Sequence, residues 1–271
     1  MAVEEDLLYR IENGVAWLTM NRPQVGNAMT PEVRDRMRDI INDLNVSYEA
    51  RAIVITATGE KMFCPGADIS TDRAVVRPQG APERIVGQNR RMMLNGQLQL
   101  MPAIINSELP IIAAVNGTAA GVGAHLALVC DLVIMADNAK FIEVFARRGL
   151  IPDGLGTWIL PRLIGLQKAK ELCFFADDVP AQRALEIGLC NKVVPKAELQ
   201  STAREWAERL AGGPTRAYML MKWLLNRSLD VDMRTIMEEE AWAVEAVTQT
   251  QDMTEGVASF REKRPPQWTG F

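Results

Sequence analysis

Histidine and paired cysteines are nearly absent from this sequence. The 271-residue chain contains one histidine, His125, and four cysteines, Cys64, Cys130, Cys173 and Cys190, with no CxxC pair among them. Zinc sites built from histidine and cysteine need several such ligands close together, so this sequence excludes that class of site. Three of the cysteines lie in apolar contexts, which predicts reduced, packed thiols in a cytoplasmic protein.

Several nucleotide-binding and nucleophile motifs are also missing. The sequence has no GxxxxGK[ST] phosphate loop and no GxSxG nucleophile elbow. Gly117, Gly121 and Gly123 are spaced GxxxGxG, whereas dinucleotide binding requires GxGxxG. These absences favour chemistry that uses neither a metal nor a covalent nucleophile.

Export, membrane and nucleic-acid signals are weak. The sequence begins MAVEEDLLYR, with acidic residues where a signal peptide carries basic ones. Residues 111–130 form an uncharged run long enough to span a membrane, but Asn116-Gly117 is a turn signal inside it. We therefore expect a buried strand, a turn and a buried helix, with a membrane span as the alternative. The net charge of −4 predicts no general attraction to nucleic acid or acidic membranes.

Alternating strand and helix patterns predict an α/β fold with mostly parallel pairing in its middle part. Asn13-Gly14 separates two strand-like runs and predicts a hairpin, and Thr30-Pro31 predicts the start of a helix. Asp72–Gly87 is polar and rich in turn residues, so we expect a loop, followed by a long helix that ends before Pro110. Further strands are expected at 52–59, 111–115 and 132–136, and helices dominate after Lys196.

Two glycine-containing loops each follow a predicted strand. They are KMFCPGADIS (61–70) and VNGTAAGVGAH (115–125). Small residues at the start of a helix expose unpaired backbone N–H groups, and two such donors converging on one point would stabilise a carbonyl oxygen that becomes negative. From the residues alone, two ordinary turns are an equally good interpretation.

Four spaced motifs carry a resemblance to a known family. They are NRPQVGNAM (21–29), FCPGADI (63–69), PIIAAVNGTAAGVGAHLALVCDL (110–132) and GLIPDGLGTWILPRLIG (149–165). In this order, over essentially the whole chain, the sequence resembles the crotonase, or enoyl-CoA hydratase/isomerase, family. The resemblance implies a spiral core of ββα units (1–205) holding an acyl-CoA pocket. It also implies a helical C-terminal region (206–271) used for trimerisation and CoA contacts. The protein would then be a homotrimer or a dimer of trimers, with coenzyme A as part of the substrate and no separate cofactor.

By the same resemblance, the oxyanion donors are the backbone N–H groups of Ala67 and Val122. Asp68 is expected to be structural and to cap the segment that follows it. The neighbouring substrate-binding positions, with the adenine of CoA against the first two, are Cys64, Pro65, Gly66, Ile69 and Gly121.

The acid/base positions differ from those of typical hydratases of the family, which use two glutamates. Their positions here hold His125 and Phe145, and phenylalanine cannot transfer a proton. Glu143 would face the same side as Phe145 in an extended segment, since residues i and i+2 share a face. The two-glutamate mechanism is therefore not expected for this chain.

Asp153, in the turn IPDG, matches the single carboxylate of isomerase-type relatives. One carboxylate suffices to move a proton between two carbons of one substrate. The alternative is that Asp153 caps the following helix. For His125, we expect a position beside the substrate, where an imidazole suits proton transfer near neutral pH. The alternative is a buried core histidine.

The C-terminal segment ASFREKRPPQW completes the predicted site. Phe260 and Lys263 match residues that approach CoA from a neighbouring subunit in the family, and Arg261 and Arg264 add positive charge suited to phosphates. A solvated helix end is the alternative. We favour an enoyl-CoA isomerase. Three alternatives stay open: a hydratase with a different acid/base set, a C–C bond hydrolase of a β-diketone or cyclic CoA ester, and a CoA-thioester-binding protein with little catalysis.

Overall fold

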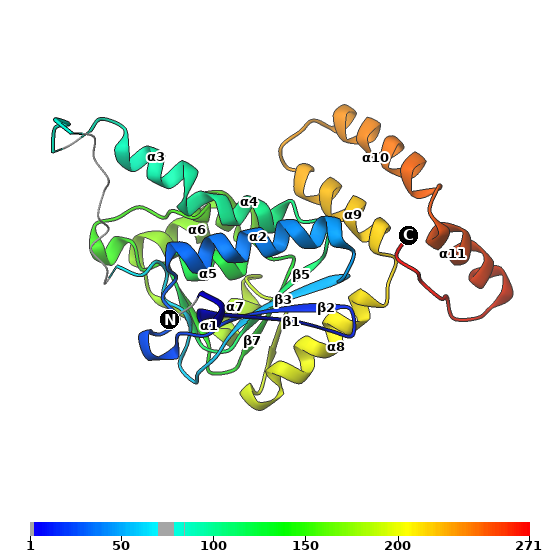
Figure 1. Ribbon diagram of the computed structural model, residues 1–271, viewed down its shortest axis with the longest axis horizontal. Helices are drawn as coiled ribbons and strands as arrows, with labels where there is room; N and C mark the ends of the chain where they lie inside the picture. Colours follow the sequence, from blue (N-terminus) through cyan, green and yellow to red (C-terminus); the bar gives the residue numbers. More distant parts are fainter. Residues whose placement is uncertain (1–2, 70–78, 84) are drawn as a thin grey trace.

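The computed structural model describes residues 3–69, 79–83 and 85–271 (Figure 1). Its strands form a six-stranded sheet, in the order β1-β2-β3-β5-β7-β10, and a four-stranded sheet, in the order β4-β6-β8-β9. The strands are β1 (Leu7–Glu12), β2 (Val15–Met20), β3 (Ala52–Ala57), β4 (Met62–Cys64), β5 (Ile111–Val115), β6 (Thr118–Ala120), β7 (Leu132–Ala136), β8 (Lys140–Ile142), β9 (Asp178–Pro180) and β10 (Lys192–Val194).

The helices surround these sheets and continue beyond them. The α-helices are α1 (Val3–Asp6), α2 (Pro31–Ser47), α3 (Gln88–Asn95), α4 (Leu100–Ile105), α5 (Val122–Leu128), α6 (Gly156–Phe175), α7 (Ala181–Glu186), α8 (Leu199–Ala211), α9 (Thr215–Arg227), α10 (Met233–Val247) and α11 (Gln251–Glu262). Short 3-10 turns are η1 (Pro23–Val25), η2 (Gln97–Gln99), η3 (Ala146–Arg148) and η4 (Lys196–Glu198).

Local sequence signals place the first elements correctly. β1 and β2 form an antiparallel hairpin whose turn residues, Asn13 and Gly14, have φ of 53° and 73°. This left-handed pair matches the twist of the two strands. The side chain of Thr30 caps α2 by accepting from the N–H of Val33 at 3.3 Å, and Pro31 occupies the first helical position. Both predictions are confirmed.

The middle of the larger sheet is parallel, as predicted. β2, β3, β5, β7 and β10 pair in parallel, and their side chains are almost entirely buried apolar groups. Figure 1 shows α2 and α4 on one side of this sheet and α8 on the other. A sheet covered on both faces needs near-continuous apolar strands, which explains the runs AIVITA and IIAAV.

The stretch before Pro110 differs from the prediction. The expected long helix is divided into α3, η2 and α4, and the break lies at Gly96, with φ −129° and ψ −91°. A Cβ at Gly96 would lie 2.7 Å from the carbonyl oxygen of Met92, so the chain turns where only glycine fits. Half of the predicted loop Asp72–Gly87 lies outside the described residues, and its described parts, 79–83 and 85–87, contain no helix or strand.

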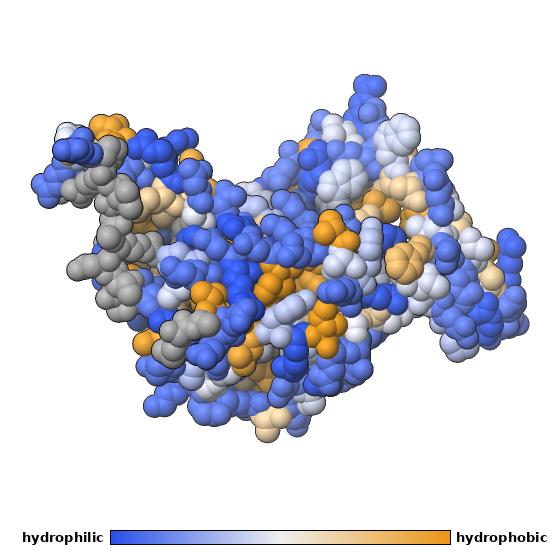
Figure 2. All heavy atoms as spheres, viewed as in Figure 1, coloured by the Kyte–Doolittle hydropathy of each residue, from blue (hydrophilic) through white to orange (hydrophobic). Residues whose placement is uncertain are grey.

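The C-terminal helices extend away from the sheets, and Figure 1 shows α10 and α11 projecting on the side of α9. White to orange side chains gather over this end of the molecule in Figure 2. Exposed apolar residues on these helices include Met233, Met237, Trp242 and Phe260, the last 85% exposed. The boundary expected at residue 205 falls inside α8, which packs on the sheet. Division of the chain into a core and a C-terminal region stays a proposal, and we place the boundary after α8.

In the described part of the chain, no helix is both long enough and apolar enough to cross a membrane. The uncharged run 111–130 forms β5, β6 and α5, which are buried within the fold. The strand–turn–helix interpretation of this run is therefore confirmed.

Candidate active site

Three short parallel strands assemble the candidate site. β4, β6 and β8 lie side by side in the smaller sheet, with β6 in the middle. Because the carboxyl ends of parallel strands meet at one edge, the residues that follow them come together. Ala67 follows β4, Val122 follows β6 and Glu143 follows β8.

The two glycine loops contact each other directly. A Cβ built on Gly123 would lie 2.1 Å from the carbonyl oxygen of Cys64, and one on Gly66 would lie 3.6 Å from the nitrogen of Val122. Only glycine allows the backbones to approach so closely. The N–H groups of Ala67 and Val122 donate no hydrogen bond to any residue in the described ranges. Two unpaired donors on adjoining loops are what an oxyanion site requires.

His125, on α5, is paired with Glu143. Its Nε2 lies 3.1 Å and 3.0 Å from the two carboxylate oxygens, and the two side chains are 0% and 4% exposed. The ring of Phe145 stacks on the imidazole, with centroids 5.4 Å apart and an angle of 11° between the planes. The imidazole has no exposed surface, so in this structure it has no direct access to a substrate.

The turn that carries Asp153 lies against the same group of residues. A Cβ on Gly154 would lie 3.3 Å from Cγ1 of Val122 and 3.5 Å from Nδ1 of His125. Asp153 is half-buried, and its Oδ1 is buried without a hydrogen-bond partner in the described chain. Leu155 occupies the N-cap position directly before α6, and no side-chain hydrogen bond caps the start of this helix. The alternative that Asp153 serves as a helix cap is therefore not what the structure shows.

The environment of Asp153 favours a carboxyl group that exchanges a proton. Burial raises the pKa of Asp153, a positive charge on His125 lowers it, and the charge of Glu143 raises it further. The net direction is upward from the ordinary value. A raised pKa in a group beside unpaired oxyanion donors is typical of a general base or acid.

Asp68 forms an ion pair with Arg22, and a cap by its carboxylate stays a prediction. Its Oδ2 accepts from Nη1 of Arg22 at 2.9 Å, and the same Arg22 nitrogen donates to the carbonyl of Ala28 at 2.7 Å. This buried pair ties the loop after β4 to the segment 21–29. The segment that Asp68 was expected to cap begins outside the described residues.

The remaining predicted substrate positions fall into two groups. Cys64 is completely buried, and burial raises the pKa of its thiol to about 12, so it remains a neutral thiol that donates to the carbonyl oxygen of Gly66 at 3.7 Å. Pro65 lies within the first oxyanion loop, and Gly121 lies within the second. Ile69 is 81% exposed beside the loop after β4.

Phe260 and Lys263 lie at the end of α11, on the projecting helices, and are exposed. A contact of these two residues with CoA stays a prediction. Arg264 is already engaged by Glu255 and Glu262, both at 2.6 Å, so its charge is largely neutralised locally.

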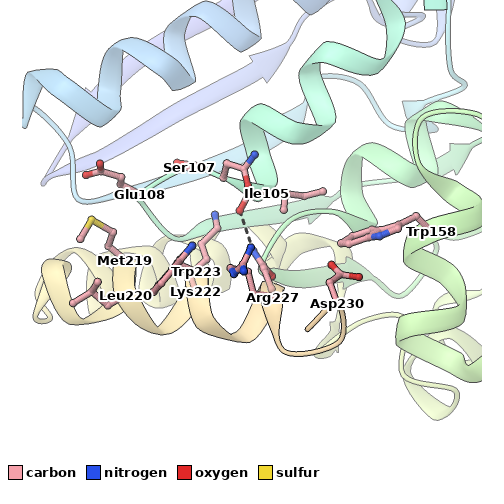
Figure 3. Close-up of a pocket in the computed structure, with 12 residues that line it drawn as sticks. Ile105, Ser107, Glu108, Trp158, Met219, Leu220, Lys222, Trp223, Arg227 and Asp230 are labelled. Atoms are coloured by element: carbon pink, nitrogen blue, oxygen red, sulfur yellow. Dashed lines mark hydrogen bonds between the residues drawn. The ribbon is translucent and has the colours of Figure 1, made fainter. Parts of the chain in front are cut away.

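A separate pocket of about 450 Å³ lies between α9 and the end of α4 (Figure 3). Figure 3 shows Lys222, Trp223 and Arg227 of α9 on one side and Trp158 of α6 on the other. Lys222 bonds the Asp131 carboxylate at 2.8 Å, and Arg227 binds Glu239 through two nitrogens. These charges are paired and no predicted site residue lines the pocket, so we do not assign catalysis to it.

In the ranges that the structure describes, no cluster of histidine, cysteine, aspartate or glutamate could hold a metal ion. The arrangement is thus two unpaired N–H donors, a half-buried carboxylate and a buried histidine–glutamate pair. The sequence profile of the enoyl-CoA hydratase/isomerase family matches residues 10–270. The chain belongs to this family.

Individual relatives agree with the assignment. The chain is similar to a short-chain-enoyl-CoA hydratase of Clostridium acetobutylicum, with 36% identity over 253 residues and 93% of each protein covered. It is also similar to the 1,2-epoxyphenylacetyl-CoA isomerase of Escherichia coli, with 35% identity over 266 residues, 98% of this chain and 99% of that one. The crystal structure of an enoyl-CoA hydratase from Bacillus anthracis superimposes with a TM-score of 0.88 at 33% identity, covering 98% and 100% of the two chains. The predicted crotonase-like α/β fold is confirmed.

Glu143 is the residue of the site whose role the sequence did not predict. The sequence indicates only that Glu143 would lie on the same side as Phe145 if the segment were extended. In the structure both residues contact His125, although Phe145 has helical dihedrals and lies beyond the end of β8. The available signal was a glutamate in an otherwise apolar context, since ionisable groups are rarely buried without a partner.

Proposed function

We propose that this member of the family is an acyl-CoA isomerase in which Asp153 is the acid/base group. The thioester carbonyl would accept hydrogen bonds from the N–H groups of Ala67 and Val122. Asp153 would remove a proton from one carbon and return it to another. The observation that carries the proposal is a half-buried carboxylate whose Oδ1 has no hydrogen-bond partner in the described chain, in the turn that packs against Val122, the residue that supplies one oxyanion donor.

The chemistry of each group follows from its surroundings. The two N–H donors stabilise negative charge on the thioester oxygen when the neighbouring carbon loses its proton, and they need no reorganisation for this. Asp153 becomes a carboxylic acid and then a carboxylate again, so protons balance over one turnover. Its raised pKa makes it a stronger base than an exposed aspartate.

The hydratase alternative needs a second group that handles water. Phe145 provides none, and Glu143 is occupied by His125. The alternative of C–C bond hydrolysis through His125 and Asp153 needs a histidine in contact with substrate, whereas this ring has no exposed surface. Relatives of both kinds match at similar identity, a short-chain-enoyl-CoA hydratase at 36% and 1,2-epoxyphenylacetyl-CoA isomerase at 35%, so the choice rests on the residues of the site. These observations favour the isomerase.

A panel of CoA esters tests the proposal. Isomerisation of 3-enoyl-CoA to 2-enoyl-CoA, hydration of 2-enoyl-CoA, and ring opening of cyclic β-diketone CoA esters are measured in parallel with CoA-thioester affinity. We expect isomerisation to dominate, and Asp153→Asn to lower its rate by about 10²–10⁴-fold. Asp177→Asn, an exposed carboxylate outside the site, is the matched control and should retain full activity. Hydration as the main activity, or binding without turnover, would overturn the assignment.

For the CoA end, we propose that a neighbouring subunit presents Phe260 and Lys263. The exposed apolar residues of α10 and α11 support a homotrimer or a dimer of trimers, because large apolar surfaces are usually covered by partners. Sedimentation should show such assemblies at micromolar concentration, and a monomer alone would contradict this. The cytoplasmic location also stays a prediction.

A further inference from the structure

His125 connects two carboxylates that come from different parts of the chain. Its Nε2 lies at about 3 Å from both oxygens of Glu143, which follows β8. With Glu143 ionised, its carboxylate only accepts hydrogen bonds, and Nε2 is then the donor in both contacts. The other ring nitrogen, Nδ1, is buried and has no partner among the described residues.

Nδ1 is directed at the turn that holds Asp153. A Cβ on Gly154 would lie 3.5 Å from it, and the buried Oδ1 of the adjacent Asp153 is also without a partner. An unpartnered carboxylate oxygen and an unpartnered imidazole nitrogen are complementary when the nitrogen carries a proton. The two atoms make no direct hydrogen bond in this structure, so a protonated Nδ1 would act on Asp153 through one bridging water or through its charge.

The ring is held in this orientation by its surroundings. Phe145 stacks on it, and a Cβ on Gly156 would lie 2.1 Å from its Cε1. The imidazole is therefore in close contact with the backbone at the start of α6 on one side and with Phe145 on another, and together with the contact to Glu143 this restricts its movement.

Beyond the proposed function, and resting on it for the role of Asp153, we propose that His125 is a doubly protonated positioning residue. It is held by Glu143 through Nε2 and keeps Asp153 in its ionised, base-competent form through Nδ1. Around a neutral ring, the buried carboxylate of Glu143 and the half-buried carboxylate of Asp153 would place two negative charges close together, away from most of the solvent. An imidazolium between them reduces this to one, which is the less costly arrangement.

The other titratable groups near this pair do not interfere. In the described part of the chain they are Cys64, which lies on β4 against α5, and Cys173, on α6. Burial raises the pKa of these thiols to about 12 and about 11, so both are neutral. The charges that act on Asp153 are those of His125 and Glu143.

Because His125 is the only histidine, its ring nitrogens can be observed without assignment. In protein labelled with ¹⁵N-histidine, the proposal requires imidazolium signals at about pH 7, where an ordinary imidazole is mostly neutral. In Asp153→Asn, the neutral Nε2–H ring should appear at a lower pH than in wild type. Asp177→Asn should match wild type. A neutral ring in the wild-type protein at about pH 7, or a titration unchanged by Asp153→Asn, would overturn the proposal whatever reaction the enzyme catalyses.

Glu143→Gln provides the kinetic test. The amide keeps the shape but removes the charge that holds the imidazolium, and His125 acts on Asp153 more strongly than Glu143 does. The acidic limb of the kcat/KM profile should therefore move to higher pH. We expect kcat/KM to fall roughly 10–100-fold near pH 6 and by less near pH 8. A purely structural role predicts the same loss at both pH values, and this result would refute the proposal.

Discussion

Gly156 is the position where one added methyl group should disrupt the candidate site most directly. A Cβ there would lie 2.1 Å from Cε1, 2.2 Å from Nε2 and 2.9 Å from Nδ1 of His125. Carbon atoms in contact are normally about 3.5–4.0 Å apart. In Gly156→Ala, the imidazole must therefore move by more than about 1 Å, which breaks its contact with Glu143.

The size of the effect follows from three contributions. Overpacking a tight interior costs about 1–3 kcal/mol, and loss of a buried hydrogen bond to a charged group costs about 1.5–3 kcal/mol. Alanine in place of glycine in a helix recovers at most about 1 kcal/mol. The net loss of stability is about 1.5–5 kcal/mol. The middle of this range, about 3 kcal/mol, corresponds to a fall in Tm of about 6–12 °C for a chain of this size.

Unfolding can be followed by fluorescence of the six tryptophans, during heating or in urea. A double-mutant cycle supplies the control, because His125→Ala removes the ring that the new methyl group meets. In that background Gly156→Ala should be neutral or slightly stabilising. Equal destabilisation in both backgrounds, or no destabilisation of the single variant, would refute the reasoning.

Three further variants test the site. Val122→Pro removes one oxyanion N–H at the first position of α5, where proline is tolerated, and should lower kcat by about 10²–10³-fold. The control, Val122→Ala, keeps the N–H and should retain most of the activity. Equal rates for the two variants would contradict the donor role. Because folding raises the pKa of Asp153, its ionisation destabilises the folded state at neutral pH. Asp153→Asn should therefore raise Tm at pH 7, with the gain disappearing below about pH 3.9, the ordinary aspartate value; a lower Tm at pH 7 would count against this. Asp68→Asn leaves Arg22 without its buried partner and should lower the free energy of unfolding, measured in urea, by about 2–4 kcal/mol. Glu238→Ala, in an exposed ion pair on α10, should lower it by less than about 0.5 kcal/mol. Similar losses of stability for both variants would refute the distinction.

The elements that the sequence by itself determined are those specified by neighbouring residues. Asn13-Gly14 defines the hairpin turn because both positions need positive φ, and Thr30-Pro31 defines the start of α2 through a cap and a fixed φ. The apolar runs of β3 and β5 predict buried parallel strands without reference to any partner. The motifs around Ala67 and Val122 likewise indicate the oxyanion loops.

The assembly of the site was decided only by the tertiary structure. β4, β6 and β8 are three-residue strands, too short to show a period, yet their pairing joins residues 67, 122 and 143. The contact between His125 and Glu143 spans 18 positions and two elements, so no local pattern encodes it. Burial then changes the chemistry, because a histidine and two carboxylates that water would solvate separately must balance one another's charge inside the protein.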